Sequence, residues 1–253
     1  HIAKTAGHKV GFTTTDGIYI QNIMMQRGDC TGPQSAEFVL KDPTVDFAVL
    51  ETARGGILRA GLGFHQCDIG IVTNVAADHL GLKDINTLED MARVKSIVPE
   101  AVMPSGFAIL NADDELVRGM AKGLQCKIAY FSMDENNPLI REHCDNGGLA
   151  AIAENGYITI CKGNWRIRVE KIINIPLTFR GKAAFMIQNI LPAVLTGFIR
   201  NFKIEDIRLA LETFIPSPVQ TPGRMNLFEF KKFNVMVDYA HNPAGFQAIA
   251  RFL

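Results

Sequence analysis

Short apolar runs alternate with segments of helical periodicity along most of the 253-residue chain, and this alternation constrains the fold most strongly. Five runs have the composition of buried strands: residues 10–14, 47–51, 69–75, 107–111 and 128–131. The segments with helical periodicity are residues 35–40, 87–102, 114–122, 183–198 and 205–214. Because fully apolar strands that alternate with helices form parallel sheets covered on both faces, the sequence predicts an α/β fold with a mostly parallel sheet and helices on both faces.

Residues 157–170 depart from this pattern, because Gly163 and Asn164 join two β-rich runs there. Such a pattern predicts an antiparallel hairpin with a tight turn, which would form a small antiparallel insert on the sheet. Residues 174–179 could add a third strand at the edge, since Pro176 has no N–H group to donate to a neighbouring strand.

The segment between Ile215 and Arg224 contains three prolines and reads as a linker. A new apolar strand follows at residues 233–240. We therefore expect a central domain over residues 1–217 and the truncated start of a Rossmann-like C-terminal domain over residues 222–253. Both ends of the sequence read as parts of helices, so we expect the chain to be an internal piece of a longer protein.

The composition excludes several classes of function. Lys+Arg and Asp+Glu both number 26, so no bulk charge draws the chain to nucleic acid or to an anionic membrane surface. No apolar run approaches the roughly 20 residues of a membrane span. The five cysteines form no CxxC pair, and no signal peptide is visible, which is typical of free thiols in a cytoplasmic protein.

Polar residues follow most of the predicted strands, at the edge of a parallel sheet where ligands bind. Glu51 ends the second strand, and Asn74, Asp78 and His79 follow the third. The fourth strand is followed by residues 111–114 ("NADD") and the last by residues 238–242 ("DYAHN"). Acids in such positions also commonly cap the next helix, and a single histidine near a turn is often a surface residue. The coincidence of Glu51 and His79 nevertheless favours a shared site.

Lys95 is unusual because it falls inside the apolar stripe of the helix predicted after His79. The stripe consists of Leu88, Met91, Ala92, Val98 and Val102. The lysine could extend outward along apolar surface to reach water. Alternatively, it is a functional lysine held against the sheet near the end of the third strand.

Several short motifs resemble those of the Mur ligase superfamily of ATP-dependent amide-forming enzymes, and they occur in the same order. They are "AVLE", "VTNVAADHLG", "ARVK", "ILNADD", "FMIQN", "PGRM" and "VDYAHNP". The resemblance covers nearly the whole chain and implies a central domain like that of P-loop NTPases. The glycine-rich phosphate loop of the family, which precedes the first helix in relatives, does not occur in residues 1–253.

The resemblance also implies an acyl-phosphate mechanism, in which ATP phosphorylates a carboxylate and an amine then displaces phosphate. By this comparison Glu51 and His79 would each bind Mg²⁺, and Lys95 matches a lysine that many relatives carbamylate. Asn189 matches an adenine-contacting amide, and Arg224 matches a linker arginine that reaches the ATP phosphates.

Two further residues complete the nucleotide site that the resemblance implies. Asp238 matches an acid that binds the ribose of ATP, and we include Asn74 among the cofactor-binding residues.

A narrower resemblance, carried by "TTTDGIYIQ", "GDCTGPQSA" and "ETARGGILRAGLGF", is to Mur-like ligases that join arginine to the aspartate side chains of a polyaspartate backbone. From charge, we expect Arg54 and Arg59 to anchor that polyanionic peptide. The partners would then be arginine and a polyaspartate-type peptide, within a homo-oligomer. The alternatives are a ligase for a peptidoglycan precursor or folate, and a non-catalytic Mur-like binding domain.

Overall fold

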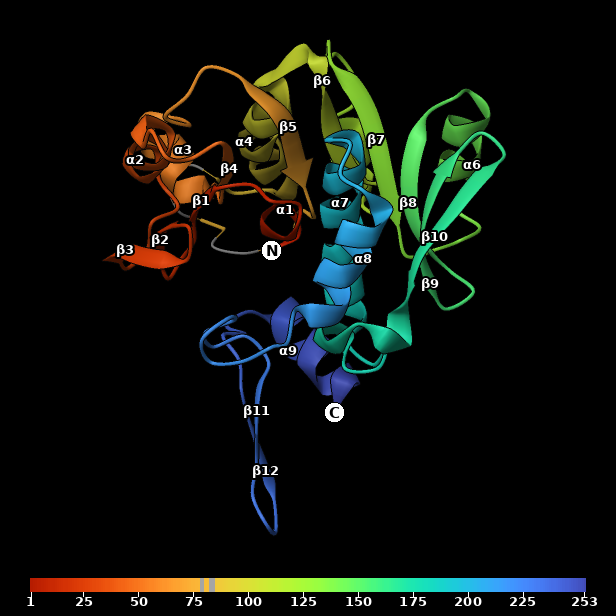
Figure 1. Ribbon diagram of the computed structural model, residues 1–253. Coiled ribbons are helices and arrows are strands. Elements are labelled where there is room, and N and C mark those ends of the chain that lie inside the picture. Colours follow the sequence, from red (N-terminus) through yellow and green to blue (C-terminus); the bar gives the residue numbers. More distant parts are fainter. Residues whose placement is uncertain (78–79, 82–84) are drawn as a thin grey trace.

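The computed structural model of the protein describes residues 1–77, 80–81 and 85–253. Within these residues the strands form three sheets, of six, four and two strands (Figure 1). None of the described helices is long and apolar enough to cross a membrane.

The largest sheet has the strand order β10-β9-β8-β7-β6-β5. Its four parallel strands, β5 to β8, span Cys67–Val72, Val102–Asn111, Lys127–Ser132 and Leu149–Glu154. The sheet continues as an antiparallel hairpin of β9 (Tyr157–Lys162) and β10 (Trp165–Lys171). The predicted hairpin is therefore confirmed, and it extends the parallel sheet by pairing with β8.

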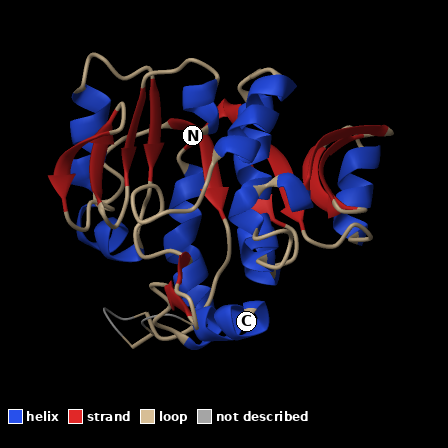
Figure 2. Cartoon of the chain, turned by 60° about the horizontal axis from the view of Figure 1, so that its bottom comes forward, coloured by secondary structure: helices blue, strands red, loops and turns tan. Residues whose placement is uncertain are grey.

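Helices cover both faces of this sheet (Figure 2). On one face, Ala108 and Leu110 belong to a core shared with helices α4, α5 and α6. On the other face, Ile109 belongs to a core shared with α7 and α8. These helices span Leu88–Glu100, Glu115–Gly119, Pro138–Asp145, Ala184–Ile199 and Ile204–Thr213. Because successive residues of β6 face opposite cores, its buried part over residues 106–110 is a continuous run without polar side chains, and the predicted α/β class is confirmed.

The four-stranded sheet has the order β3-β2-β1-β4. These strands span Val10–Thr13 (β1), Gly17–Ile20 (β2), Ile23–Arg27 (β3) and Phe47–Leu50 (β4). β1 and β4 are parallel, and the other two pairings are antiparallel. Helix α2 (Pro33–Lys41) packs closely on β1, because a Cβ atom at Gly11 would lie 2.6 Å from the Cγ1 atom of Val39. Helix α3 (Arg54–Ala60) follows β4.

The two ends of the chain lie against α7. The first helix, α1 (Ile2–Thr5), packs on α7 and α8. At the other end, β11 (Asn226–Glu229) and β12 (Asn234–Val237) form a projecting hairpin, followed by α9 (Pro243–Phe252) (Figure 1). The ring of Phe252 in α9 lies 5.2 Å from that of Phe179, which places α9 beside the segment that leads into α7.

The predicted edge strand over residues 174–179 is wrong. This segment forms two short 3₁₀-helices, η1 (Ile172–Asn174) and η2 (Pro176–Thr178). The Thr178 hydroxyl donates to the carbonyls of Ile172 and Ile175, at 2.8 Å each, and so closes the turn on itself. A local hydroxyl–backbone interaction of this kind competes with strand pairing.

Candidate active site

Glu51 lies directly after β4, where the four-stranded sheet ends. One of its carboxylate oxygens, Oε2, accepts a hydrogen bond from the Thr15 backbone at 3.2 Å. The side chain retains contact with solvent, yet neighbouring atoms surround its carboxylate, and this desolvation raises the pKa of Glu51 above its ordinary value. The charges of Asp16 and Asp29 raise the pKa further, whereas the Thr15 hydrogen bond and the Arg224 charge oppose the increase. Glu51 is therefore a partly desolvated acid, and a bound cation would stabilise its ionised form.

Three consecutive backbone groups after β5 are held by side chains from three different elements. Asn111, at the end of β6, donates from Nδ2 to the Thr73 carbonyl at 2.7 Å. Lys95 of α4 donates from Nζ to the Asn74 carbonyl, also at 2.7 Å. The Val75 N–H donates to Asp114 Oδ2 at 2.7 Å. We call residues 73–75, with these three contacts, the clamped turn.

Lys95 is partly buried, as its position in the apolar stripe predicts. Within α4, Met91, Val94 and Pro99 form the buried face. The contact with Asn74 directs the ammonium group of Lys95 toward the end of β5, so the side chain does not simply extend into solvent. The prediction that it also lies near His79 concerns a residue outside the described part of the chain.

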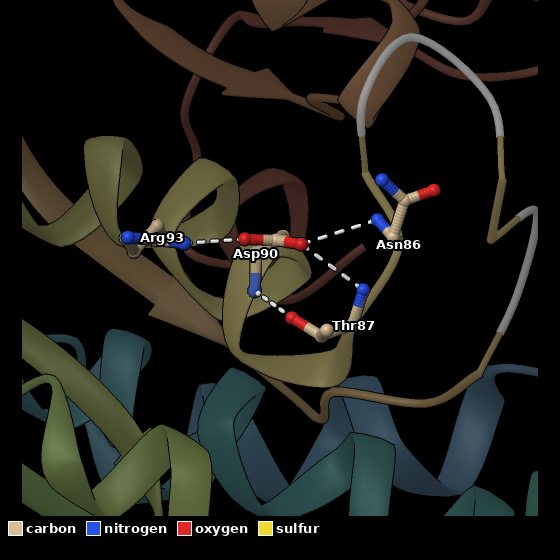
Figure 3. A network of polar contacts seen from close by, with 4 residues as sticks. All are labelled: Asn86, Thr87, Asp90 and Arg93. Atoms are coloured by element: carbon tan, nitrogen blue, oxygen red, sulfur yellow. Dashed lines mark hydrogen bonds and ion pairs between the residues drawn. The ribbon is translucent and has the colours of Figure 1, made fainter.

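The start of α4 is fixed by a network of hydrogen bonds, which Figure 3 shows. Thr87 accepts a hydrogen bond from the Asp90 backbone at 3.1 Å, and Asp90 accepts in return from the Thr87 backbone at 3.0 Å. Asp90 also accepts from the Asn86 backbone and forms an ion pair with Arg93. This reciprocal arrangement is a capping box, and it sets where the helix carrying Lys95 begins.

Asp114 was expected as a helix cap and has a second role that the sequence did not reveal. Its Oδ1 atom accepts from the Val117 backbone at 3.1 Å, which caps α5. Its Oδ2 atom serves the clamped turn, 39 residues away in sequence. The neighbouring Asp113 accepts from Ser132 and from the Met133 backbone, and so connects β7 to the same sheet edge. The "NADD" motif was the available signal, but its long-range partners could not be identified from spacing.

Arg224 and Asp238 lie near each other in the linker and the C-terminal segment. The two carboxylate oxygens of Asp238 accept from the Met225 backbone at 2.9 Å and the Ala240 backbone at 2.8 Å. The Arg224 guanidinium lies 4.7 Å from the centre of the Tyr239 ring. The charge of Arg224 also lowers the pKa of Glu51, so the linker arginine acts electrostatically on this carboxylate.

The remaining predicted site residues lie on helices. Asn189 is exposed on α7. Arg54 begins α3 and is partly buried, whereas Arg59 in its last turn is exposed. Helix α3 packs tightly on the loop before α2, because a Cβ atom at Gly56 would lie 3.0 Å from the Cα atom of Gly32. The segment carrying both arginines is thus joined to the loop between β3 and α2.

The predicted magnesium ligands can be compared only in part, because His79 lies outside the described residues. Among the residues that the structure describes, no group of three or more His, Cys, Asp or Glu side chains is arranged to hold a metal. The Glu51 carboxylate nevertheless fits Mg²⁺, a hard cation that proteins commonly bind through one or two carboxylates, with water and phosphate oxygens in the other positions.

The chain belongs to the family described as the Mur ligase middle domain, which matches residues 1–197. It is 54% identical, over all 253 residues, to the cyanophycin synthetases of Synechocystis sp. and of Geminocystis herdmanii. It covers only 29% of each of these relatives. A UDP-N-acetylmuramate–L-alanine ligase from Acetivibrio thermocellus is 28% identical over an alignment of 231 positions that covers 82% of this chain and 44% of that ligase.

Solved structures of Mur ligases share the fold. MurF from Acinetobacter baumannii superposes with a TM-score of 0.67 at 18% identity, over all of this chain and 50% of that one. MurF from Thermotoga maritima, solved in complex with ADP, superposes with a TM-score of 0.58 at 16% identity, over all of this chain and 53% of that one. The predicted resemblance to Mur ligases and to cyanophycin synthetase is confirmed.

Proposed function

We propose that the protein containing this chain is an ATP-dependent amide ligase that joins arginine to the aspartate side chains of a polyaspartate backbone. The observation that carries this proposal is the 54% identity to cyanophycin synthetases along the whole chain, against 28% for the muramate–alanine ligase. In this reaction a side-chain carboxylate would take the γ-phosphoryl group of ATP and release ADP. The arginine α-amine would then attack the acyl carbon, lose a proton and displace phosphate.

The ends of β4 and β5 would supply the electrostatics of the phosphoryl step. Glu51 would hold Mg²⁺, which when bound offsets the charge of the triphosphate. Arg224 would place further positive charge near the transferring group, where fixed charges lower the barrier most, and Lys95, which matches a carbamylated lysine of relatives, would act beside it. His79 would bind a second Mg²⁺. The clamped turn supports this assignment because it orders the backbone that the Lys95 ammonium group contacts.

The nucleoside of ATP would contact the other predicted residues. Asn189 is exposed and so is accessible to adenine. Asp238 already accepts two backbone hydrogen bonds, but a carboxylate offers about four acceptor positions, which leaves room for ribose hydroxyls. Asn74 would contact the nucleotide from the clamped turn.

The same proposal covers the peptide substrate and the domains. Arg54 and Arg59 would anchor the acidic peptide near the end of β4. Residues 1–217 would form the central ATP-binding domain, and residues 222–253 would begin the C-terminal domain. The protein would assemble as a homo-oligomer in the cytoplasm.

A substrate screen with the full-length protein tests this function. ADP release would be measured with ATP, Mg²⁺ and either arginine plus an aspartate-peptide primer, or muramyl and folyl acceptors with their own amino acids. We expect ADP release and a new amide product only with arginine and the aspartate primer. Turnover confined to a muramyl or folyl acceptor would contradict the proposal in favour of another Mur-type ligase, and no turnover with any acceptor would favour a binding domain.

A further inference from the structure

A cavity of about 440 Å³ lies between the base of the β9–β10 hairpin and the segment that leads into α7. We call it the Tyr157 cavity. Its walls are residues 155–157, residues 171–173, Arg180 and Gly181, with Ile187 of α7 at its base. Ile187 is buried and Asn189 is exposed, and two residues correspond to about 200° of rotation around a helix. The cavity and the proposed adenine contact are therefore on different faces of α7.

The cavity carries positive charge and no acidic lining residue. Lys171 and Arg180 line it directly. Arg168 and Lys171 both lie over the Tyr157 ring, at 5.0 Å and 5.9 Å from its centre. Within the described residues, none of these three cations forms an ion pair with a carboxylate, whereas the nearby Arg166 and Arg208 do. The cations are thus available to an anionic ligand.

Two of the backbone donors around the cavity are already used within the protein. The Ile172 N–H donates to the Gly156 carbonyl at 2.9 Å, and the Gly181 N–H donates to the Thr178 carbonyl at 3.1 Å. A ligand would therefore meet separate cationic side chains and not a cradle of N–H groups of the kind that surrounds a phosphate. Separate cations match carboxylates spaced along a chain, because alternate side chains of an extended peptide lie about 7 Å apart.

The turn that presents Arg180 is conformationally unusual. Phe179 and Arg180 have φ values of 50° and 60°, a left-handed conformation that is uncommon for residues other than glycine. The contacts of Thr178 with Ile172 and Ile175 hold the turn in this form. Beside it, the Ile173 side chain is 54% exposed on the cavity wall and offers apolar surface to the methylene groups of a peptide.

We propose that the Tyr157 cavity is a second binding site for an acidic peptide, which docks an extended segment through its carboxylates on Lys171, Arg180 and Arg168. The choice of an acidic peptide rests on the proposed function. Such a site would hold a part of the polyaspartate backbone whose side-chain carboxylates have not yet been joined to arginine, so that the chain stays bound between additions.

Photo-crosslinking with the full-length protein, without ATP, tests this site. The probe is an aspartate peptide of about ten residues with a photoreactive group at one end. Labelling of the segment 155–187 is quantified by mass spectrometry, which separates this site from labelling near Arg54 and Arg59. We expect the double variant Lys171→Gln, Arg180→Gln to reduce labelling of that segment about tenfold, because two charge-assisted contacts are lost.

The matched control removes two lysines from another cavity in the same six-stranded sheet. Lys127 and Lys162 line a cavity of about 540 Å³ together with Phe107, Ile128 and Leu149. The variant Lys127→Gln, Lys162→Gln loses the same net charge and should label segment 155–187 like the wild type. Wild-type labelling in the Lys171, Arg180 variant, or an equal loss in the control, would overturn the proposal.

Turnover distinguishes failure of this site from failure of the function. With a saturating short primer, the Lys171, Arg180 variant should release ADP at the wild-type rate, because a short primer reaches only the reacting end. Labelling that depends on these cations in a protein without arginine-dependent turnover would retain the site and contradict the function. Arginine-dependent turnover without labelling that depends on these cations would retain the function and contradict the site.

Discussion

At the scale of single residues, the account depends on the electrostatic setting of Glu51. Desolvation, Asp16 and Asp29 favour the protonated carboxyl, so the folded chain binds this proton more tightly than the unfolded chain does. The stability that the proton contributes is fully present below the unfolded pKa of a glutamate and is lost as the pH rises through the raised folded value. A neutral side chain at position 51 has no such proton to lose, so this decrease in the free energy of unfolding does not occur.

We therefore predict that Glu51→Gln stabilises the protein relative to the wild type in metal-free buffer near pH 7. The advantage should shrink toward pH 4, where Glu51 of the wild type is itself protonated. Thermal unfolding of both proteins across this range measures the difference, with Glu115→Gln as a control at an exposed acid on α5. A difference in Tm that stays constant with pH, or that grows toward acid, would refute the raised pKa of Glu51.

Residue-scale reasoning from the sequence was successful where a local pattern carried the signal. Lys95 was identified because its position interrupts an apolar stripe, and it is partly buried and bonded to Asn74. The second role of Asp114 could not be predicted, because its partner Val75 lies 39 residues away and the contact depends on how β5 and β6 align. The roles of Asn189, Arg54 and Arg59 remain predictions.

At the scale of elements, the account predicts that the two helix caps near the site are not equivalent. Thr87→Ala removes a cap of α4 only and should cost about 1 kcal/mol of unfolding free energy with little change in kcat. Asp114→Ala removes the cap of α5 and one contact of the clamped turn, leaving two N–H groups without their acceptor. It should cost about 1–3 kcal/mol and also lower kcat, because the turn that faces Lys95 loosens.

Urea unfolding and kcat of arginine-dependent ADP release, measured on the same preparations, check this contrast. Asp114→Asn serves as the conservative variant, since one oxygen can still accept from one of the two N–H groups. Partial recovery of kcat in Asp114→Asn is expected. If Thr87→Ala and Asp114→Ala lowered kcat in proportion to their loss of stability, the clamped turn would have only a structural role.

Helices and strands could be predicted where the apolar periodicity extended over many residues and where the turns contained the usual residues, such as glycine. Strands β5, β6 and β7 and the hairpin around Gly163 follow from such patterns, whereas α6 and β8 were not predicted. The β2–β3 hairpin was missed because its turn uses Gln21 and Asn22, with φ values of 48° and 73°, where glycine is the usual signal. The segment 174–179 was misassigned because Thr178 forms local bonds that no strand pattern reveals.

At the scale of the whole molecule, the candidate site is assembled from parts that different sheets position. Glu51 follows a strand of the four-stranded sheet, and the clamped turn follows a strand of the six-stranded sheet. The charge of Arg224, in the linker beyond α8, lowers the pKa of Glu51. The sequence predicted which strand ends carry polar groups, but the division into two sheets depends on long-range pairing, which periodicity does not encode.

The central claim is that this edge of the molecule carries an ATP-dependent amide-forming reaction in which Lys95 acts on the phosphoryl step. The most direct measurement is kcat for arginine- and primer-dependent ADP release by full-length Lys95→Gln, with its unfolding free energy determined in parallel. Arg93→Gln, an exposed cation on the same helix, is the matched control. The account predicts a loss in kcat of about a hundredfold or more for Lys95→Gln, near-wild-type stability and a nearly normal control. Wild-type kcat in Lys95→Gln would contradict it.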